Sequence, residues 1–368
     1  MGKKELVLVS IVSTACILFI VGHFILKRNI ISFSVNFELQ NARTITTENG
    51  QVNISSRTIK ITWFRKPQWL PSSFNFSQCD FTNCALSYNS SDMDKSHAVI
   101  FHYRFLSKVV PKKRNGQIWI IWTLESPAND GDLTEKWRKE MDWSATYRTD
   151  SDIYVQRMLK LRDKPIVRNY SEILRKKTKL VSWAVSNCKT PSKRRKYVEE
   201  LKKYIDIDIY GRCGENNDFC KKKTKMECHA HLSSDYKFYL GFENSLCKDY
   251  LTEKVFNNFL DNNSMIYVAR GAPNLHEFIP KNTVIYTSNF RSPKHLAQFL
   301  IKLGSNETEY TSYLRETDRY YLFGNRKDRA FCKICELLNT YKERKYSGNG
   351  RNFNAWYRKD TCKTPTDI

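Results

Sequence analysis

Residues 236–254 read YKFYLGFENSLCKDYLTEK. Residues 236–242 are mostly aromatic or aliphatic, as in a buried strand, and Thr252 precedes two charged residues in the way that an N-cap precedes a helix. The turn between them holds a carboxylate, an amide and a hydroxyl at residues 243–245. Ligands of open parallel sheets bind beyond the carboxyl ends of the strands, so this polar turn is a candidate binding site.

The sequence around this stretch alternates between strand-like and helix-like segments. Short runs rich in β-branched and aromatic residues indicate strands, and longer runs that open with Thr-Pro or Ser-Pro indicate helices. This alternation predicts an α/β fold with parallel sheets that have helices on both faces. We expect strands at 58–64, 97–106, 116–126, 179–187, 205–211, 235–244, 264–271 and 283–290, and helices at 190–204, 252–262 and 292–304.

Two units of this kind predict two Rossmann-like domains that face each other. The chain has 368 residues, of which 41% are hydrophobic, and this is enough to build both cores. We expect the following organisation: a cytoplasmic tail at 1–5, a transmembrane helix at 6–26, a stem at 27–56, an N-terminal domain at 57–178, a C-terminal domain at 179–345, and a tail at 346–368 that packs back or is disordered.

The apolar run at residues 6–26 contains no charged side chain. A helix of this length crosses a hydrocarbon core of about 30 Å, whereas the apolar part of a signal peptide is usually only about 7–15 residues long and ends at a small-residue cleavage site. We therefore expect an uncleaved membrane anchor. The flanking lysines and arginine, Lys3 and Lys4 before the run and Lys27 and Arg28 after it, do not decide its orientation.

Glycosylation sequons and cysteines indicate which side of the membrane holds the body of the chain. Ten cysteines follow the apolar run, an even number that suits disulfides in an oxidising compartment. All the sequons also follow the run, which places the body of the chain in the secretory lumen. The expected N-glycosylation sites are Asn53, Asn75, Asn89, Asn169, Asn262 and Asn306.

The pair Cys332 and Cys335 has the short spacing of a zinc knuckle or a redox site, and Cys79 with Cys84 could supply a second pair of ligands. In a lumenal protein, disulfides that tie the start of the globular part to its end are the favoured interpretation. The net charge of +23 would suggest nucleic acid in a cytosolic protein. Behind a membrane anchor we expect no nucleic-acid partner, and we interpret most of the basic residues as solvated surface.

Three expected strands end in polar residues, at 124–127, 185–187 and 242–245. The helix that starts near Thr252 can offer backbone donors to a ribose or a phosphate. Lys254 lies in the first turn of that helix, where the positive end of the helix dipole disfavours a cation. An anionic ligand would remove this conflict, and an ordinary solvated lysine is the alternative.

These residues together resemble the α1,3-fucosyltransferases of glycosyltransferase family 10. Residues 236–254 match the signature of that family, and Cys247 is similar to the form found in its core-type and invertebrate branch. Further similar motifs occur in the same order along most of the chain: LESP at 124–127, WSATYRTDSD at 143–152, VSN at 185–187, YGRCG at 210–214, SPKHLA at 292–297 and FCKIC at 331–335.

The resemblance implies a single-pass type II membrane protein of the Golgi, with a lumenal GT-B-like catalytic part. It implies transfer of fucose from GDP-fucose, with inversion, to a GlcNAc hydroxyl of a glycoprotein N-glycan. The implied partners are GDP-fucose, the N-glycan acceptor and the lipid bilayer. This chemistry needs a base for the acceptor hydroxyl and positive charge near the departing diphosphate.

Roles for individual residues follow from the same resemblance. Glu125 matches the general base, and Arg194 and Lys254 match the cations that neutralise the diphosphate. Three further residues, Tyr147, Arg148 and Glu243, are expected to shape the cleft. The expected contacts to guanosine, ribose and fucose come from Ser186, Asn187, Asn244, Ser245, Tyr250 and Glu253.

Asp150 and Asp152 form an Asp-x-Asp pattern that binds a divalent metal in another glycosyltransferase architecture. Here the pattern lies inside the family motif at 143–152, so we interpret both carboxylates as structural. We expect no metal site and no required cofactor, with Mn or Mg as a stimulant rather than a requirement.

The chain departs from the family pattern at residues 264–268, at Arg270 and at residues 314–331. The cysteine pattern favours the innermost GlcNAc of N-glycans as the acceptor. The first alternative is a distal LacNAc or LacdiNAc-type (Lewis-type) acceptor. A catalytically inactive glycan-binding scaffold is a further alternative, which the presence of both a base and phosphate-binding cations disfavours.

Overall fold

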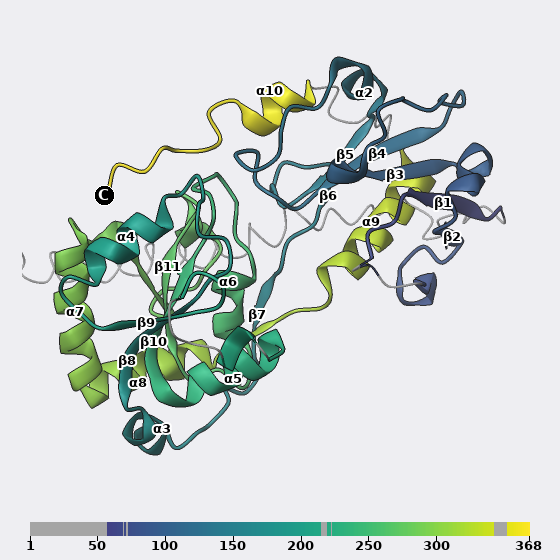
Figure 1. Cartoon of the computed structure of the whole chain (residues 1–368). Helices are drawn as coiled ribbons and strands as arrows, with labels where there is room; N and C mark the ends of the chain where they lie inside the picture. The colour runs from purple at the N-terminus through teal and green to yellow at the C-terminus, as the bar shows by residue number, and fades with distance from the viewer. Residues whose placement is uncertain (1–56, 69, 71–72, 215–218, 222, 342–351) are drawn as a thin grey trace, which may run out of the picture. The chain divides into compact units, whose positions relative to one another are not determined.

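The computed structural model describes residues 57–368, except 69, 71–72, 215–218, 222 and 342–351 (Figure 1). The expected tail at 1–5, anchor at 6–26 and stem at 27–56, together with the sequon at Asn53, lie outside the described residues. Within the described part, no helix has both the length and the apolar character that a membrane crossing requires.

The first sheet is six-stranded and entirely parallel. Its strand order is β2-β1-β3-β4-β5-β6, with β3 and β4 in the middle. Because the inner strands are covered on both faces, they are nearly continuous apolar runs, as in IWIIWT of β4. The strands are β1 (Ile59–Phe64), β2 (Cys84–Ser87), β3 (Ala98–His102), β4 (Ile118–Thr123), β5 (Trp143–Thr146) and β6 (Ile153–Tyr154).

The second sheet is five-stranded and also parallel, in the order β12-β11-β10-β8-β9. Its central strand, β10, is the apolar part of the quoted stretch, so the polar turn follows the middle strand of the sheet. The strands are β8 (Lys179–Ala184), β9 (Ile207–Tyr210), β10 (Tyr236–Phe242), β11 (Ile266–Arg270) and β12 (Val284–Tyr286). The expected parallel α/β architecture is confirmed for both halves of the chain.

A small antiparallel ribbon pairs β7 (Leu159–Leu161) with β13 (Tyr320–Leu322). The described α-helices are α2 (Glu135–Glu140), α3 (Tyr170–Lys176), α4 (Arg194–Leu201), α5 (Lys225–Asp235), α6 (Glu253–Phe256), α7 (Pro293–Ser305), α8 (Glu307–Thr317), α9 (Arg326–Thr340) and α10 (Phe353–Arg358). Short 3-10 helices lie at Phe76–Gln78, Ser90–Lys95, Tyr103–Phe105, Phe219–Lys221, Asn257–Phe259, Leu275–Glu277 and Thr287–Asn289.

Two helices differ from the sequence prediction. The helix expected from Pro191 begins at Arg194, because Lys193 has a left-handed backbone with φ of 49° and Ser192 donates its hydroxyl to the carbonyl of Glu243 at 2.8 Å. The helix expected at 252–262 is only the short α6, followed by a 3-10 turn. Asn258 in that turn donates its amide to the carbonyl of Thr283 instead of facing solvent.

Helix α9 follows the second sheet in the chain but packs in the core of the first sheet. Its Phe331 stacks on Trp122 of β4, with 5.9 Å between ring centroids. Two disulfides, Cys79–Cys332 and Cys84–Cys335, fasten the same helix beside β2. The expectation that these four cysteines form disulfides between the start and the end of the globular part is confirmed.

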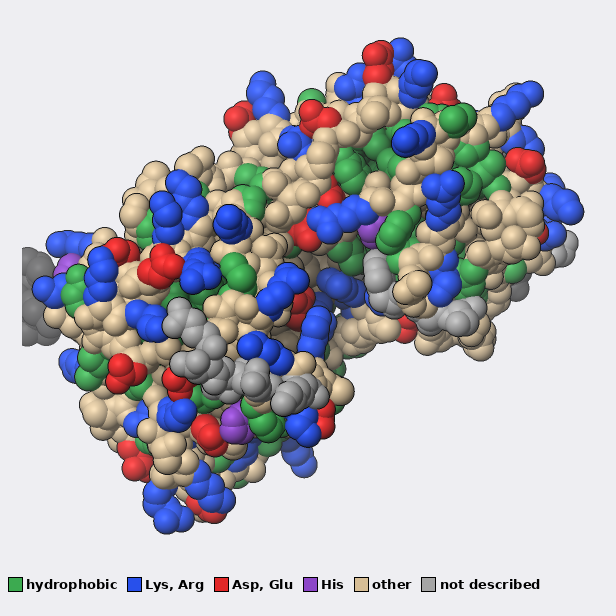
Figure 2. Space-filling model, in the orientation of Figure 1, with side chains coloured by type: hydrophobic (Ala, Val, Ile, Leu, Met, Phe, Trp, Pro, Cys, Tyr) green, Lys and Arg blue, Asp and Glu red, His purple; other side chains and the backbone are tan. Residues whose placement is uncertain are grey.

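Three more disulfides use the other described cysteines: Cys188–Cys213, Cys220–Cys228 and Cys247–Cys362. The last of these joins the turn after β10 to the C-terminal tail, and the buried Arg270 pairs with Asp367 of the same tail at 2.7 Å. Arg270, a departure from the family pattern, therefore holds the tail in place. Figure 2 shows that the Lys and Arg side chains on the visible face are scattered rather than gathered in one patch.

Gly241 of β10 lets the start of α6 approach the sheet. A Cβ atom on this residue would lie 2.3 Å from the backbone oxygen of Lys254, which is closer than any real contact. We expect Gly241→Ala to lower the free energy of unfolding by about 1–3 kcal/mol or more, because the overpacked helix must move away. Gly131→Ala is the matched control, since nothing lies within 4 Å of its added Cβ. Equal denaturation midpoints for the two variants would contradict this account.

Candidate active site

Glu125 follows β4 and accepts hydrogen bonds from the turn after β10. Its Oε1 accepts from the hydroxyl of Tyr250 at 2.6 Å and from the amide of Asn244 at 3.1 Å. The same oxygen accepts from the backbone N–H of Ser126 at 3.0 Å. The other oxygen, Oε2, lies 3.4 Å from the guanidinium of Arg104. The structure thus brings together three of the predicted site residues.

These contacts set the protonation state of Glu125. Burial raises the pKa of its carboxyl, but the hydrogen bonds from Tyr250, Asn244 and Ser126 and the charge of Arg104 outweigh burial, so the pKa is lowered from the ordinary value. The side chain is 25% exposed. Glu125 is therefore an ionised carboxylate with access to solvent, as a base that receives a proton from a ligand must be.

The C-terminal helix α10 fixes the loop that contains Glu125. The hydroxyl of Tyr357 donates to the backbone oxygen of Glu125, and the guanidinium of Arg358 donates to the carbonyl of Pro127 at 2.8 Å and of Gly131 at 3.0 Å. Sequence reasoning missed both residues, because nothing near residue 357 indicates contact with a loop more than two hundred positions earlier.

Arg104 and Asp130 support the same loop from the first sheet. Arg104 donates a hydrogen bond from its Nε to Asp130 at 2.8 Å, and a second nitrogen of its guanidinium lies 3.4 Å from Glu125. Thr123 donates a hydrogen bond from its hydroxyl to Asp130 at 2.8 Å. Burial raises the pKa of Asp130. Because one guanidinium holds both carboxylates, its position also fixes the distance between them. The sequence contains no motif for these residues, so they too were missed.

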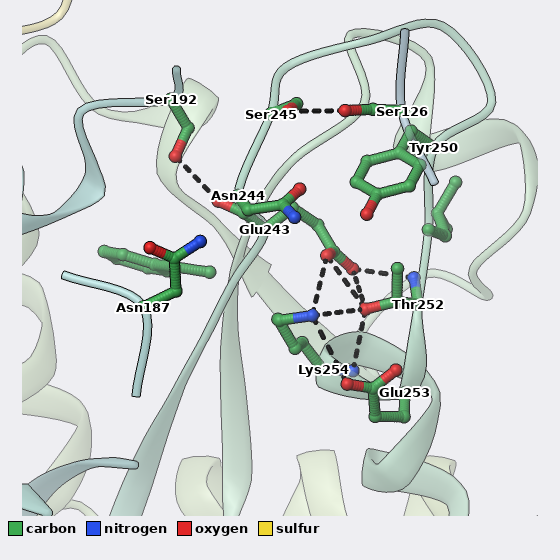
Figure 3. Close-up of polar contacts among 12 residues, drawn as sticks. Ser126, Asn187, Ser192, Glu243, Asn244, Ser245, Tyr250, Thr252, Glu253 and Lys254 are labelled. Atoms are coloured by element: carbon green, nitrogen blue, oxygen red, sulfur yellow. Dashed lines mark hydrogen bonds and ion pairs between the residues drawn. The ribbon is translucent and has the colours of Figure 1, made fainter. Parts of the chain in front are cut away.

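Glu243 lies just after β10 and is fully buried, and Figure 3 shows it pointing toward Thr252 and Lys254. Its Oε1 accepts the backbone N–H of Thr252 at 2.7 Å and the hydroxyl of Thr252 at 2.8 Å. Its Oε2 lies 3.4 Å from the ammonium of Lys254. Glu243 therefore connects the end of the strand to the start of α6, a structural role within the expected site.

Lys254 also lies 3.3 Å from the carboxylate of Glu253 and donates to the hydroxyl of Thr252 at 2.9 Å (Figure 3). Burial alone would lower its pKa, but Glu243 and Glu253 outweigh burial and raise it. The unfavourable position of this cation near the start of α6 is thus offset by two carboxylates of the protein. Its side chain as a whole is 27% exposed.

Ser245 joins the turn after β10 to the loop after β4. It is fully buried and accepts a hydrogen bond from the hydroxyl of Ser126 at 2.7 Å (Figure 3). It also accepts a hydrogen bond from the amide of Asn129 at 3.0 Å. The amide of Asn129 also lies 3.3 Å from Glu125 Oε1. The predicted residue Ser245 therefore contacts the loop that contains Glu125 both at Ser126 and at Asn129, an asparagine that sequence reasoning did not select.

Arg194, at the start of α4, is buried and holds two backbone segments. Its guanidinium donates to the carbonyl of Phe242 at 2.7 Å and to the carbonyl of Asn187 at 3.1 Å. Its Nε and the side-chain oxygen of Asn244 are both buried without a hydrogen-bond partner among the described residues. Burial lowers the pKa of Arg194. Ser186 and the side chain of Asn187 are exposed beside this arginine, as a ligand-binding edge requires.

Tyr147 packs against Tyr250, whereas Arg148 binds Asp150 and helix α10. The ring of Tyr147 packs edge-on against Tyr250, with centroids 5.0 Å apart. Arg148 donates to both oxygens of Asp150, at 2.9 and 2.8 Å, and to the carbonyl of Trp356 at 2.7 Å. Asp152 accepts from the backbone N–H and the hydroxyl of Ser144. Both aspartates are thus engaged by protein donors, and within the described residues no cluster of potential metal ligands occurs.

The described asparagines of the sequons all have exposed side chains. Four of them accept a backbone hydrogen bond at the start of a helix, which leaves the glycosylation prediction open. These four are Asn75, Asn89, Asn169 and Asn306. Asn262, the fifth, lies just before β11.

Comparison with known proteins gives matches over nearly the whole described chain. Residues 56–158 match the family model "Fucosyltransferase, N-terminal", and residues 174–356 match "Glycosyltransferase family 10 (fucosyltransferase) C-term". The chain is 32% identical over 298 residues to the glycoprotein 3-alpha-L-fucosyltransferase A of Drosophila melanogaster, a match that covers 77% of this chain and 56% of that relative. The chain thus spans little more than half of the fly protein.

Other relatives are covered more fully. The human 4-galactosyl-N-acetylglucosaminide 3-alpha-L-fucosyltransferase FUT5 is 35% identical over 286 residues, 75% of this chain and 72% of the relative. A solved structure of an alpha1,3-fucosyltransferase with GDP-fucose superimposes with a TM-score of 0.52 at 16% identity. It covers 80% of this chain and 94% of the solved one, and at this identity the likeness concerns the fold.

The buried pair of Glu243 and Lys254 leads to a stability prediction. Lys254→Met leaves the buried carboxylate without its cation, and we expect the free energy of unfolding to fall by about 3 kcal/mol near pH 8. Burial already raises the pKa of Glu243, and loss of the cation raises it further. Protonation therefore stabilises the folded variant as pH falls through that pKa, and the deficit shrinks near pH 5.

The double variant Glu243→Gln/Lys254→Met is the control for this experiment. Because this variant has no carboxylate at residue 243, its stability deficit relative to the wild type should not shrink between pH 8 and pH 5 as that of Lys254→Met does. Denaturant-induced unfolding near pH 8 and near pH 5 measures the free energy of unfolding of both variants. A pH-independent deficit in Lys254→Met would show that Glu243 is not the titrating partner.

Proposed function

Since the chain belongs to glycosyltransferase family 10, the fucosyltransferases, we propose that it is an inverting α1,3-fucosyltransferase that uses GDP-fucose. The observation that supports this most directly is the ionised Glu125, which is held by Tyr250 and Asn244 of the turn after β10. A base attached to the expected donor-binding turn has a defined position relative to the anomeric carbon. A protein that only binds glycans would not need this arrangement.

In the proposed reaction Glu125 removes the proton of the acceptor hydroxyl. Oε1 already accepts the hydroxyl of Tyr250 and the amide of Asn244, so Oε2 is the oxygen that takes the proton. The acceptor oxygen forms a bond to the anomeric carbon of fucose from the face opposite the diphosphate. The bond from that carbon to the phosphate oxygen breaks, and its electron pair leaves with GDP, which inverts the configuration.

We place the donor at the carboxyl ends of β8 and β10. Lys254 and Arg194 supply positive charge, and two buried atoms, Nε of Arg194 and Oδ1 of Asn244, have no hydrogen-bond partner among the described residues. Three side chains that are exposed or half-exposed suit contacts with the nucleoside and the sugar: Ser186, Asn187 and Glu253. Metal is not required in this scheme, and Mn or Mg would act only as a stimulant.

For the acceptor we propose a GlcNAc of a glycoprotein N-glycan, and within it the innermost GlcNAc. Support comes from Cys247, which is similar to the core-type form, and from the likeness to the fly glycoprotein enzyme. Distal Lewis-type acceptors are the alternative, since relatives named for galactosyl-N-acetylglucosaminide acceptors are equally similar. We further propose a type II Golgi membrane protein with residues 6–26 as its anchor.

Glu125→Gln tests the base. We expect transfer from GDP-fucose to a panel of core and antennary N-glycans to fall at least about a hundredfold, because the amide cannot accept the proton. GDP affinity should be unchanged. Glu135→Gln, on the exposed face of α2, is the matched control and should keep full activity. Full activity of Glu125→Gln would refute the assignment, and the glycan that the wild type labels would identify the acceptor class.

Tyr250→Phe tests the environment of the base through the pH profile. Its hydroxyl helps to lower the pKa of Glu125, so its loss raises that pKa, and the protonated, inactive base persists to higher pH. We expect the acidic limb of kcat/KM to move to higher pH, with a larger loss near pH 5 than near pH 7. The exposed Tyr204→Phe is the control. An identical loss at every pH would mean that Tyr250 does not tune Glu125.

A further inference from the structure

A cationic pocket lies where the chain passes between the two sheets, beside β7 and before α9. Its volume is about 320 Å³. The lining residues come from two segments that lie far apart in the sequence, 157–158 and 322–327, and none of these lining residues carries a carboxylate. The pocket is lined by Arg157, Met158, Leu322, Gly324, Asn325, Arg326 and Lys327.

Two arginines of this pocket have no counterion among the residues that the structure describes. Within the described part of the chain, neither Arg157 nor Arg326 forms an ion pair with an acidic side chain, and the Nε of Arg157 is buried without an acceptor. Burial and the nearby charge of Arg157 lower the pKa of Arg326. Holding two cations together in this way costs folding free energy, and an anion between them would offset that cost.

The pocket adjoins the turn that holds Tyr250. Gln156, the residue before Arg157, is fully buried and donates its amide to the carbonyl of Leu251 at 3.0 Å. The charge of Glu253 and the phenol of Tyr250 both act on Arg326. Arg326 is thus close enough to the proposed donor site to interact electrostatically with two of its residues, although it follows the second sheet in the sequence.

The cations already assigned to the donor are largely engaged by the protein. Arg194 donates to two backbone carbonyls, and Lys254 lies between the carboxylates of Glu243 and Glu253. A departing nucleoside diphosphate carries more than one negative charge. Further cations that are not paired within the protein would stabilise it more effectively.

We propose that Arg157 and Arg326 bind the diphosphate of the nucleotide-sugar donor, as a second cationic group beside Arg194 and Lys254. This inference rests on the proposed function, since it takes GDP-fucose as the donor. Guanidinium groups suit the role because they bind phosphate oxygens through paired hydrogen bonds. The start of the fifteen-residue helix α9, at Arg326, adds a favourable field for an anion.

The test is calorimetric titration of the purified full-length chain with GDP and, separately, with guanosine. We expect Arg157→Gln and Arg326→Gln each to weaken GDP binding by about tenfold to a hundredfold, the usual effect of one charged hydrogen-bonding group. Guanosine affinity should not change, because guanosine lacks the diphosphate. Arg319→Gln removes the same charge from an exposed pair with Glu316 and should leave both affinities unchanged.

The outcomes separate this inference from the proposed function. If the wild type binds GDP and both pocket variants bind it equally well, the diphosphate assignment is wrong and the proposed function stands. If the variants lose GDP and guanosine alike, the arginines maintain the fold and the assignment is again wrong. If the folded wild type binds no GDP, the proposed function itself fails.

Discussion

The hydrogen bond between Tyr250 and Glu125, 2.6 Å long, is the contact on which the rest of the site depends. Glu125 follows β4 of the first sheet and Tyr250 follows β10 of the second, so this bond couples the expected acceptor side to the expected donor side. The bond from Ser126 to Ser245 adds a second link between the same loops. The bond from Tyr250 helps to lower the pKa of Glu125, and both links hold the two loops together.

The C-terminal tail reinforces this coupling. The Cys247–Cys362 disulfide attaches it to the turn after β10, while Tyr357 and Arg358 bind the backbone of the Glu125 loop. One short segment thus contacts both loops that form the site. Because these contacts are mostly to backbone carbonyls, they fix the path of the loop rather than the identity of its side chains.

The cations around the expected donor side differ in whether the protein pairs them, and their positions in the sequence did not indicate this difference. Lys254 and Arg194 are held by protein groups, and the two pocket arginines, which lack counterions within the described chain, lie at the crossing between the sheets. A folded protein tolerates unpaired cations where a ligand can offset their repulsion. The distribution of paired and unpaired cations is therefore more informative about an anionic ligand than the total charge of +23.

The sequence by itself determined the parallel α/β class, the strand-turn-helix unit at 236–254 and the family, and it singled out Tyr250 and Asn244, which bind Glu125. Apolar strand runs, Ser-Pro helix starts and ordered motifs are local signals, and local signals can be read without coordinates. The tertiary structure decided that α9 packs on the first sheet, that α4 begins at Arg194, and that Arg104, Asn129 and Tyr357 contact Glu125. These features depend on contacts between residues far apart in the chain, which leave no periodic pattern in the sequence.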